Sequence, residues 1–197
     1  MSIVHKISLE DLTPENLENW RAVFSNATLE VVLPEQTKEL SESDFWELIG
    51  LLNWENGRTS AAVIEPLVRV LARASVPFIY AFQERLAEFL YQLDQQQFAE
   101  HLGEERYRPH VPFDADNFLA ARAAIVANGK HFFQRVLADP TKMPGDFTFE
   151  AILSAAQLAY ERKTNLKWNF LPKVSYETFS NTKGWGGKTW KDRYFND

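Results

Sequence analysis

The stretch VPFIYAFQERLAEFLYQL, residues 76–93, decides the fold class of this chain. Its apolar side chains recur at the spacing of one face of an α-helix, namely Phe78, Phe82, Leu86, Phe89, Leu90 and Leu93. The charged and amide side chains lie mostly off that face, namely Gln83, Glu84, Arg85 and Glu88. The stretch therefore predicts a long helix, capped by Ser75, whose apolar face packs against other helices.

The segments before this helix predict two more helices. Residues 41–44, Ser-Glu-Ser-Asp, resemble a capping box, in which a hydroxyl and a carboxylate satisfy backbone N–H groups at a helix start. We expect that helix to end at Gly57. Residues 59–74 predict the next helix, in which Pro66 indicates either a start near Glu65 or a kink.

The pattern weakens after the long helix and then returns. Residues 94–112 are polar and predict a loop with part of a helix. Asp114 or Asp116 should open the next helix, which Asn128-Gly129 should end. Thr148 is expected to cap the last helix. Together the segments predict a mainly α fold, a single helical bundle of about six helices.

Residues 1–40 are expected to form an extension packed on this core. Thr13-Pro14 predicts a helix start, because the hydroxyl can cap and proline lacks an N–H that the first turn does not need. Short runs at residues 3–9 and 28–33 alternate or are β-branched, which allows a short β-hairpin around that helix.

Residues 166–197 are rich in aromatic residues among lysines and glycines, without a sustained period. Because so many rings are rarely left in water, we expect an irregular tail that wraps the domain formed by residues 41–165. Residues 162–197 carry eight bases and three acids, whereas residues 1–60 carry four bases and eleven acids. The basic tail therefore either folds back onto acidic surface or offers a patch for phosphate groups.

Composition excludes several classes of function. The chain has 197 residues and no cysteine, which excludes disulfides, cysteine-ligated metal centres and thiol nucleophiles. Its start lacks a basic leader with a long apolar run, and no stretch reaches the roughly 20 apolar residues of a membrane span, so we expect a cytoplasmic protein. The net charge of −6 argues against general binding to nucleic acid.

Four short stretches resemble, in order, a bacterial family catalogued as domain of unknown function 4240: residues 45–49, 125–133, 137–140 and 159–164. The resemblance covers roughly residues 41–165. Members typically show paired aspartates before a Phe-x-x-Phe-Arg-x-Trp-Leu-Ile helix, then glycine, an aromatic residue and Ala-Asp-Pro. The resemblance implies an all-helical domain and brings no established activity.

Position by position, this chain keeps most of the family pattern, at Asp116, Phe118, Arg122, Gly129, Phe133 and Pro140. It departs at Ala115, which replaces one expected acid, and at Ala124, which replaces the expected tryptophan. If the paired acids and the tryptophan share a role in the family, that role is weakened in this chain.

The polar segment around residues 101–116 holds the best candidates for catalysis or metal binding: His101, Glu104, Glu105, His110, Asp114 and Asp116. Histidines and carboxylates three or four residues apart can share a helix face and ligate a metal. However, Gly103 and Pro109 interrupt any helix here, which favours a solvated loop. We predict no catalytic residue, no metal ligand and no cofactor.

Four residues are candidates for ligand binding: Asp116, Arg122, His110 and Trp46. Asp116 could pair with Arg122, leaving the guanidinium available for an anion. The favoured alternative is that Asp116 caps a helix and Arg122 forms a salt bridge to another helix. Trp46 and Trp54 are expected at the core or its rim rather than in a ligand cage.

These observations favour a non-enzymatic binding or regulatory module, such as an immunity-type partner of another protein. A second hypothesis is a hydrolase or metal-dependent enzyme that uses His101, His110, Asp114 and Asp116, which would have to converge in a concave pocket. A third is weak contact with single-stranded nucleic acid through the tail, whose rings and lysines are the residue types that stack on bases and contact phosphates.

Overall fold

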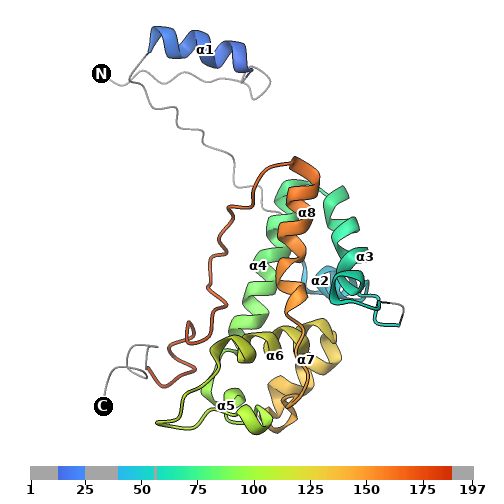
Figure 1. Ribbon diagram of the computed structural model, residues 1–197, viewed down its shortest axis with the longest axis vertical. Coiled ribbons are helices and arrows are strands. Elements are labelled where there is room, and N and C mark those ends of the chain that lie inside the picture. Colours follow the sequence, from blue (N-terminus) through green and yellow to red (C-terminus); the bar gives the residue numbers. More distant parts are fainter. Residues whose placement is uncertain (1–12, 25–39, 56, 188–197) are drawn as a thin grey trace. The chain divides into compact units, whose positions relative to one another are not determined.

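The computed structural model describes residues 13–24, 40–55 and 57–187 (Figure 1). It divides the chain into two units, Met1–Glu35 and Gln36–Asp197. The described part of the first unit is helix α1, Pro14–Val23. Thr13 caps α1 as predicted, because its hydroxyl accepts a hydrogen bond from the backbone N–H of Asn16 at 3.2 Å.

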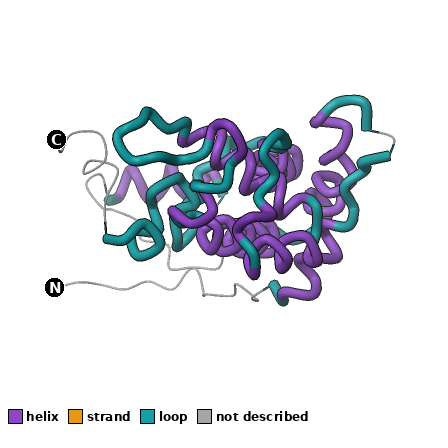
Figure 2. The backbone as a smooth tube through the Cα atoms, turned by 90° about the horizontal axis from the view of Figure 1, so that it is seen from below, coloured by secondary structure: helices purple, strands orange, loops and turns teal. Residues whose placement is uncertain are grey.

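The second unit is a helical domain, which confirms the predicted fold class. Its α-helices are α2 Glu42–Ile49, α3 Ser60–Arg73, α4 Val76–Leu93, α5 Gln96–Ala99, α6 Ala115–Ala127, α7 Lys130–Ala138 and α8 Ala155–Thr164. Short 3-10 turns occur at Gly103–Glu105, Pro140–Lys142 and Glu150–Ser154. The described residues contain helices and loops but no strand (Figure 2). Both strands of the expected hairpin fall at residues 3–9 and 28–33, outside the described residues.

Helix α4 lies at the centre of the domain, in contact with α2, α3, α6 and α8. Its fully buried residues include Phe82, Leu86 and Leu90, from the apolar face that the sequence predicts. Helix α3 packs along α8 on one side of it. Because the helices bury one another's apolar faces, the domain has a single continuous core.

Cap residues place most helix starts where the sequence predicts them. The hydroxyls of Ser41 and Ser75 accept hydrogen bonds from backbone N–H groups at the starts of α2 and α4. Asp114 does the same for α6, at 2.9 Å from the N–H of Asn117. Helix α6 ends at Ala127, next to the predicted stop, where Gly129 has a φ of 89°.

Three details differ from the prediction, and a fourth decides between its alternatives. Helix α2 ends at Ile49 rather than at Gly57, because the chain turns at once to pack Leu52 into the core. Helix α3 begins at Ser60 with Pro66 in its interior, which excludes the alternative of a start near Glu65. Thr148 caps no helix, since a 3-10 turn precedes α8. Gln83, expected off the packed face of α4, is buried.

Residues 166–187, which we call the strap, follow α8 without a helix or strand of their own. The strap runs the length of α4 (Figure 1). Near the start of α4, Phe170 stacks on Tyr80 with ring centroids 4.4 Å apart. At the other end of α4, Trp185 is 0% exposed. How residues 188–197 continue lies outside the described residues.

Candidate functional site

The four predicted ligand-binding residues lie in different surroundings. Trp46 is buried in the core, whereas His110 and Asp116 are exposed, and Arg122 is fully buried. His110 has a φ of 63° in the loop before α6, and Asp116 lies in the first turn of α6, where Asp114 is the cap. Within the described residues no hydrogen bond or ion pair joins any two of the four, so they do not form one site.

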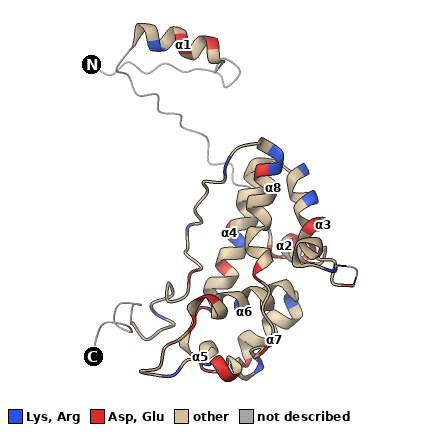
Figure 3. Cartoon of the chain, viewed as in Figure 1, with Lys and Arg blue, Asp and Glu red and all other residues tan. Residues whose placement is uncertain are grey.

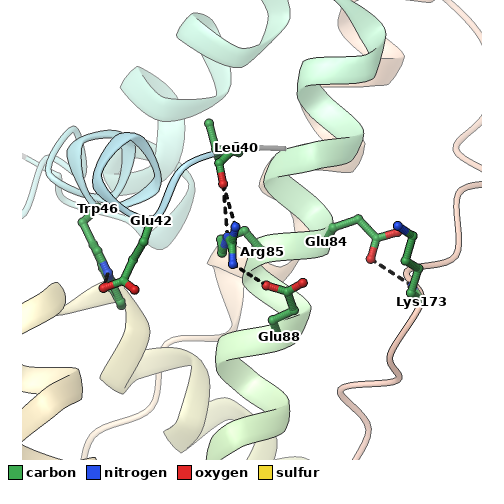
Figure 4. Close-up of polar contacts among 7 residues, drawn as sticks. All are labelled: Leu40, Glu42, Trp46, Glu84, Arg85, Glu88 and Lys173. Carbon is green, nitrogen blue, oxygen red and sulfur yellow. Dashed lines mark hydrogen bonds and ion pairs between the residues drawn. The ribbon is translucent and has the colours of Figure 1, made fainter. Parts of the chain in front are cut away.

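The contacts of Trp46 are those of a structural residue that connects helices. Its ring packs on Phe89, with centroids 4.6 Å apart, and its indole N–H donates to Glu42 at 3.3 Å (Figure 4). Lys130 of α7 lies 3.0 Å from the same carboxylate and, as the largest influence, lowers the pKa of Glu42. Trp46 and Glu42 therefore join α2 to α4 and α7.

Arg85 fixes the point at which the chain enters the helical domain. Its Nε and Nη2 both donate to the backbone carbonyl of Leu40, at 3.2 and 2.8 Å, and its Nη1 donates to Glu88 at 2.7 Å (Figure 4). On the same helix, Glu84 accepts the backbone N–H of Lys173 in the strap at 2.9 Å. These polar side chains of α4, predicted to lie off its packed face, hold neighbouring segments in place.

The side chains proposed for a hydrolase or metal enzyme lie at the surface. His101, His110, Asp114 and Asp116 are all exposed. Among the described residues, no group of three or more His, Cys, Asp or Glu side chains could hold a metal ion. The metal-dependent alternative therefore has no candidate site among the described residues.

Arg122 projects from α6 into the interior under the strap. Its Nη1 donates to the carbonyl of Leu90 and its Nη2 to the hydroxyl of Thr178, both at 2.9 Å. Its guanidinium lies 4.8 Å from the centroid of the Phe118 ring, and its Nε has no hydrogen-bond partner. Burial lowers the pKa of Arg122 to about 10, with Asp94 and Glu177 opposing that shift. The expected salt bridge to another helix is replaced by bonds to a carbonyl and a hydroxyl.

Asp94, at the end of α4, holds the strap with both carboxylate oxygens. Oδ1 accepts the backbone N–H of Phe179 at 3.1 Å and the indole N–H of Trp185 at 2.8 Å. Oδ2 accepts the backbone N–H of Asn181 at 2.9 Å and the hydroxyl of Ser180 at 3.2 Å. A fully buried carboxylate is thus satisfied entirely by one segment of chain, and we call Asp94 and Arg122 the clasp.

An aromatic surface lies elsewhere on the domain, where two loops meet. The Trp54 ring lies 4.6 Å from Phe149 and 6.1 Å from Phe147, measured between centroids. Phe149 is buried, but Trp54 is 40% and Phe147 is 42% exposed. We call these three residues the aromatic ledge.

Backbone contacts hold the two loops of the aromatic ledge in place. Gly57 closes the first loop, with its N–H donating to the carbonyl of Asn53 at 2.9 Å. In the second loop, the N–H of Phe149 donates to Ala120 of α6 at 3.1 Å. Gly145 passes so close to Gly103 that a Cβ on either glycine would press on the other's backbone. These contacts brace the described backbone beside Trp54 and Phe147.

Residues 40–162 match the model of a family described as a protein of unknown function, DUF4240. The chain belongs to this family. The match confirms the family resemblance, and it covers α2 to α7 and α8 as far as residue 162, so it ends before the strap. Neither the curated proteins nor the solved structures contain a match to the chain.

Sequence reasoning missed the two features that the structure brings out. Asp94 directly follows the last apolar residue of the 76–93 pattern, and that position is the one signal for a buried acid. Phe147 has no signal at all, because its exposure depends on how a loop of residues 143–149 crosses Gly103.

No described helix is both long and apolar enough to cross a membrane.

Proposed function

We propose that this protein is a non-enzymatic binding module that docks a basic, apolar-tipped segment of a partner protein on the aromatic ledge. The single observation that carries the proposal is the exposure of Trp54 and Phe147 side by side on a braced backbone. Tryptophan and other large rings are enriched at the centres of protein interfaces, where they contribute most of the binding energy.

The charge around the aromatic ledge favours a basic partner. The two loops, residues 50–59 and 143–150, contain three exposed acids, Glu55, Asp146 and Glu150, and one base, Arg58. Each of the three rings is next in sequence to one of these acids. A lysine or arginine can contact both the carboxylates and the face of an indole, which attracts cations.

Fixed rings also favour binding because little freedom is lost on association. The buried Phe149 ring supports Trp54 from below, so Trp54 does not have to be ordered by the partner. Immobilising a flexible side chain costs about 0.5–1.5 kcal/mol, and this cost is reduced where the ring is already held.

The test uses full-length protein labelled with 5-fluorotryptophan, in which the resonance of each tryptophan can be assigned by substitution. The probe is a peptide of alternating lysine and leucine, compared with a glutamate–leucine and a lysine–serine peptide. We expect the lysine–leucine peptide to shift the Trp54 resonance and to leave the Trp185 resonance unchanged. The other two peptides should bind at least about tenfold more weakly, because each lacks one half of the recognition.

Matched variants separate the aromatic ledge from general stickiness. The double variant W54A/F147A should lose the interaction. V70A and L158A remove side chains of similar exposure from α3 and α8 and should keep it. Equal binding of the glutamate–leucine peptide, or binding that survives W54A/F147A, would overturn the proposal.

A further inference from the structure

A surface pocket lies at the end of α8, where the chain turns back to begin the strap (Figure 1). It has a volume of about 520 Å³ and is open to solvent. This volume lies within the range of pockets that bind small molecules, roughly 300–1,000 Å³. The pocket shares no residue with the aromatic ledge, and its lining consists of Gln157, Glu161, Asn165, Leu166, Lys167 and Trp168.

The ring of Trp168 forms a fixed apolar wall of the pocket. It lies 5.4 Å from Tyr160 and 5.7 Å from Tyr80, measured between ring centroids. The backbone N–H of Trp168 donates to Oε1 of Glu161 at 3.3 Å. Leu166 is 61% exposed, so a second apolar side chain of the lining faces solvent. A ligand with an apolar body can therefore cover both side chains without first ordering the tryptophan.

The carboxylate of Glu161 is held in place but has no cationic partner among the described residues. Its Oε1 accepts from the side-chain amide of Gln157 at 3.1 Å as well as from the backbone of Trp168. None of the ion pairs between described residues includes Glu161. Two neutral donors therefore orient the carboxylate and leave its negative charge available for an ammonium group.

The end of α8 adds to the negative character of this wall. Asn165, which lines the pocket, is the C-cap of α8, and its backbone N–H donates to the carbonyl of Glu161 at 2.9 Å. A helix carries a partial negative charge at its C-terminal end, which favours cations there. The basic residues of the last turn do not take this position, since Arg162 pairs with Glu65 and Lys163 is not part of the lining.

Lys167 supplies the opposite charge. Its side chain is exposed and lines the same pocket. No ion pair joins Lys167 to Glu161 or to another carboxylate of the described residues. The pocket thus presents an anion and a cation that do not neutralise each other, beside an indole ring. A ligand with both charges can satisfy both, whereas a purely basic or purely acidic ligand meets a like charge.

We propose that this pocket binds a small zwitterion with an aromatic body, of which a free aromatic α-amino acid is the simplest. The ammonium group of the ligand pairs with Glu161, and its carboxylate pairs with Lys167. Its ring packs on Trp168 and Leu166. Because the pocket is open and the ligand is small, the dissociation constant falls in the millimolar range.

The test uses full-length protein labelled with 5-fluorotryptophan, in which W168F assigns the Trp168 resonance. The probes are L-phenylalanine, L-phenylalaninamide without the carboxylate, N-acetyl-L-phenylalanine without the ammonium group, and L-alanine without the ring. We expect L-phenylalanine to shift the Trp168 resonance with a saturable curve. The amide and the acetyl derivative should each bind about three- to fivefold more weakly, the effect of losing one exposed ion pair. L-Alanine should not reach saturation in the same range.

Two variants assign each charge of the ligand to its residue. In E161Q the glutamine keeps an oxygen that accepts from Gln157 and Trp168, while the negative charge is lost. E161Q should remove the preference for L-phenylalanine over the acetyl derivative and keep its preference over the amide. K167Q should do the reverse. K163Q, which changes a lysine of α8 outside the lining, should leave all preferences unchanged.

This crossed pattern distinguishes recognition from a change in stability, which would lower the binding of all probes together. The Trp54 resonance of the aromatic ledge is the internal control and should stay unchanged with L-phenylalanine. No shift of Trp168 up to the solubility limit, or equal binding of L-phenylalanine and both derivatives, would overturn the proposal. An equal shift of Trp54 would show adsorption of rings to any exposed tryptophan and would also overturn it.

Discussion

Two tryptophans of this protein, Trp185 and Trp54, show opposite uses of the same side chain. Trp185 is 0% exposed, and its indole N–H donates to the buried Asp94 at 2.8 Å. Trp54 is 40% exposed and lies on the buried Phe149 ring. The first is packed inside its own chain, whereas the second remains open to solvent.

The difference lies in what the surroundings supply. A buried indole needs an acceptor, and the end of α4 supplies a carboxylate that also binds two backbone N–H groups. An exposed indole needs only another side chain packed against its ring, as Phe149 packs against Trp54. Loss of Trp185 should therefore damage the fold, and loss of Trp54 should damage binding.

The largest expected effect comes from Asp94→Ala. This change leaves four hydrogen-bond donors of the strap without their acceptor and removes one of the two negative charges that act on Arg122, leaving Glu177. We expect the free energy of unfolding to fall by about 5 kcal/mol, the upper range for breaking a buried charged network. Chemical denaturation followed by circular dichroism measures it. Glu88→Ala on the same helix should cost less than about 1 kcal/mol, and a similar loss for both would contradict the role of Asp94.

The second prediction compares the two tryptophans directly. Trp185→Ala should lower the free energy of unfolding by about 3–4 kcal/mol, because a fully buried ring leaves a cavity. Trp54→Ala should lower it by about 1 kcal/mol, because its ring is already partly hydrated. Both values come from the same denaturation experiment. If Trp54→Ala costs as much as Trp185→Ala, the aromatic ledge is part of the core rather than a binding surface.

Local sequence rules predicted the helices well because caps act within one turn. Thr13, Ser41 and Ser75 each precede a helix and each accepts a backbone N–H three residues on. The apolar face of α4 was likewise readable from spacing alone. Gly57 misled the prediction, because it closes a loop rather than a helix, a difference that depends on the packing of Leu52.

The candidate sites were less predictable because both depend on long-range contacts. Asp94 lies 85 residues before Phe179, and no local pattern links the two. Arg122 was singled out from the family pattern, but its burial beneath a segment that follows α8 could not be inferred from residues near it. A surface histidine and a buried arginine look equally polar in a sequence.

Gly57→Ala gives the third prediction and changes the support of the aromatic ledge alone. A Cβ there would lie 2.6 Å from the Asn53 carbonyl and 2.5 Å from a methyl group of Val63, so the loop has to shift. We expect a loss of about 1–2 kcal/mol in the free energy of unfolding, typical of overpacking. Binding of the lysine–leucine peptide should weaken as well. Gly50→Ala, at a glycine with helical φ and ψ, is the control and should leave peptide binding unchanged.

The smallest expected effect concerns Glu65 and Arg162, an exposed ion pair between α3 and α8. Figure 3 colours the charged residues along these two helices. The hydrogen bond from Arg162, more than any other influence, lowers the pKa of Glu65 below its ordinary 4.5. A lowered pKa in the folded state stabilises the protein above the unfolded pKa, and that gain is lost as the pH falls through the folded value. A double-mutant cycle of E65Q and R162Q should therefore give a coupling of a few tenths of a kcal/mol near neutral pH, because solvent screens the pair. The coupling should vanish in acid and shrink in high salt, as denaturation of all four proteins can measure. A coupling that persists in acid would show that the two side chains interact through packing rather than through their charges. The contrast between this exposed pair and the buried clasp would then be smaller than we infer.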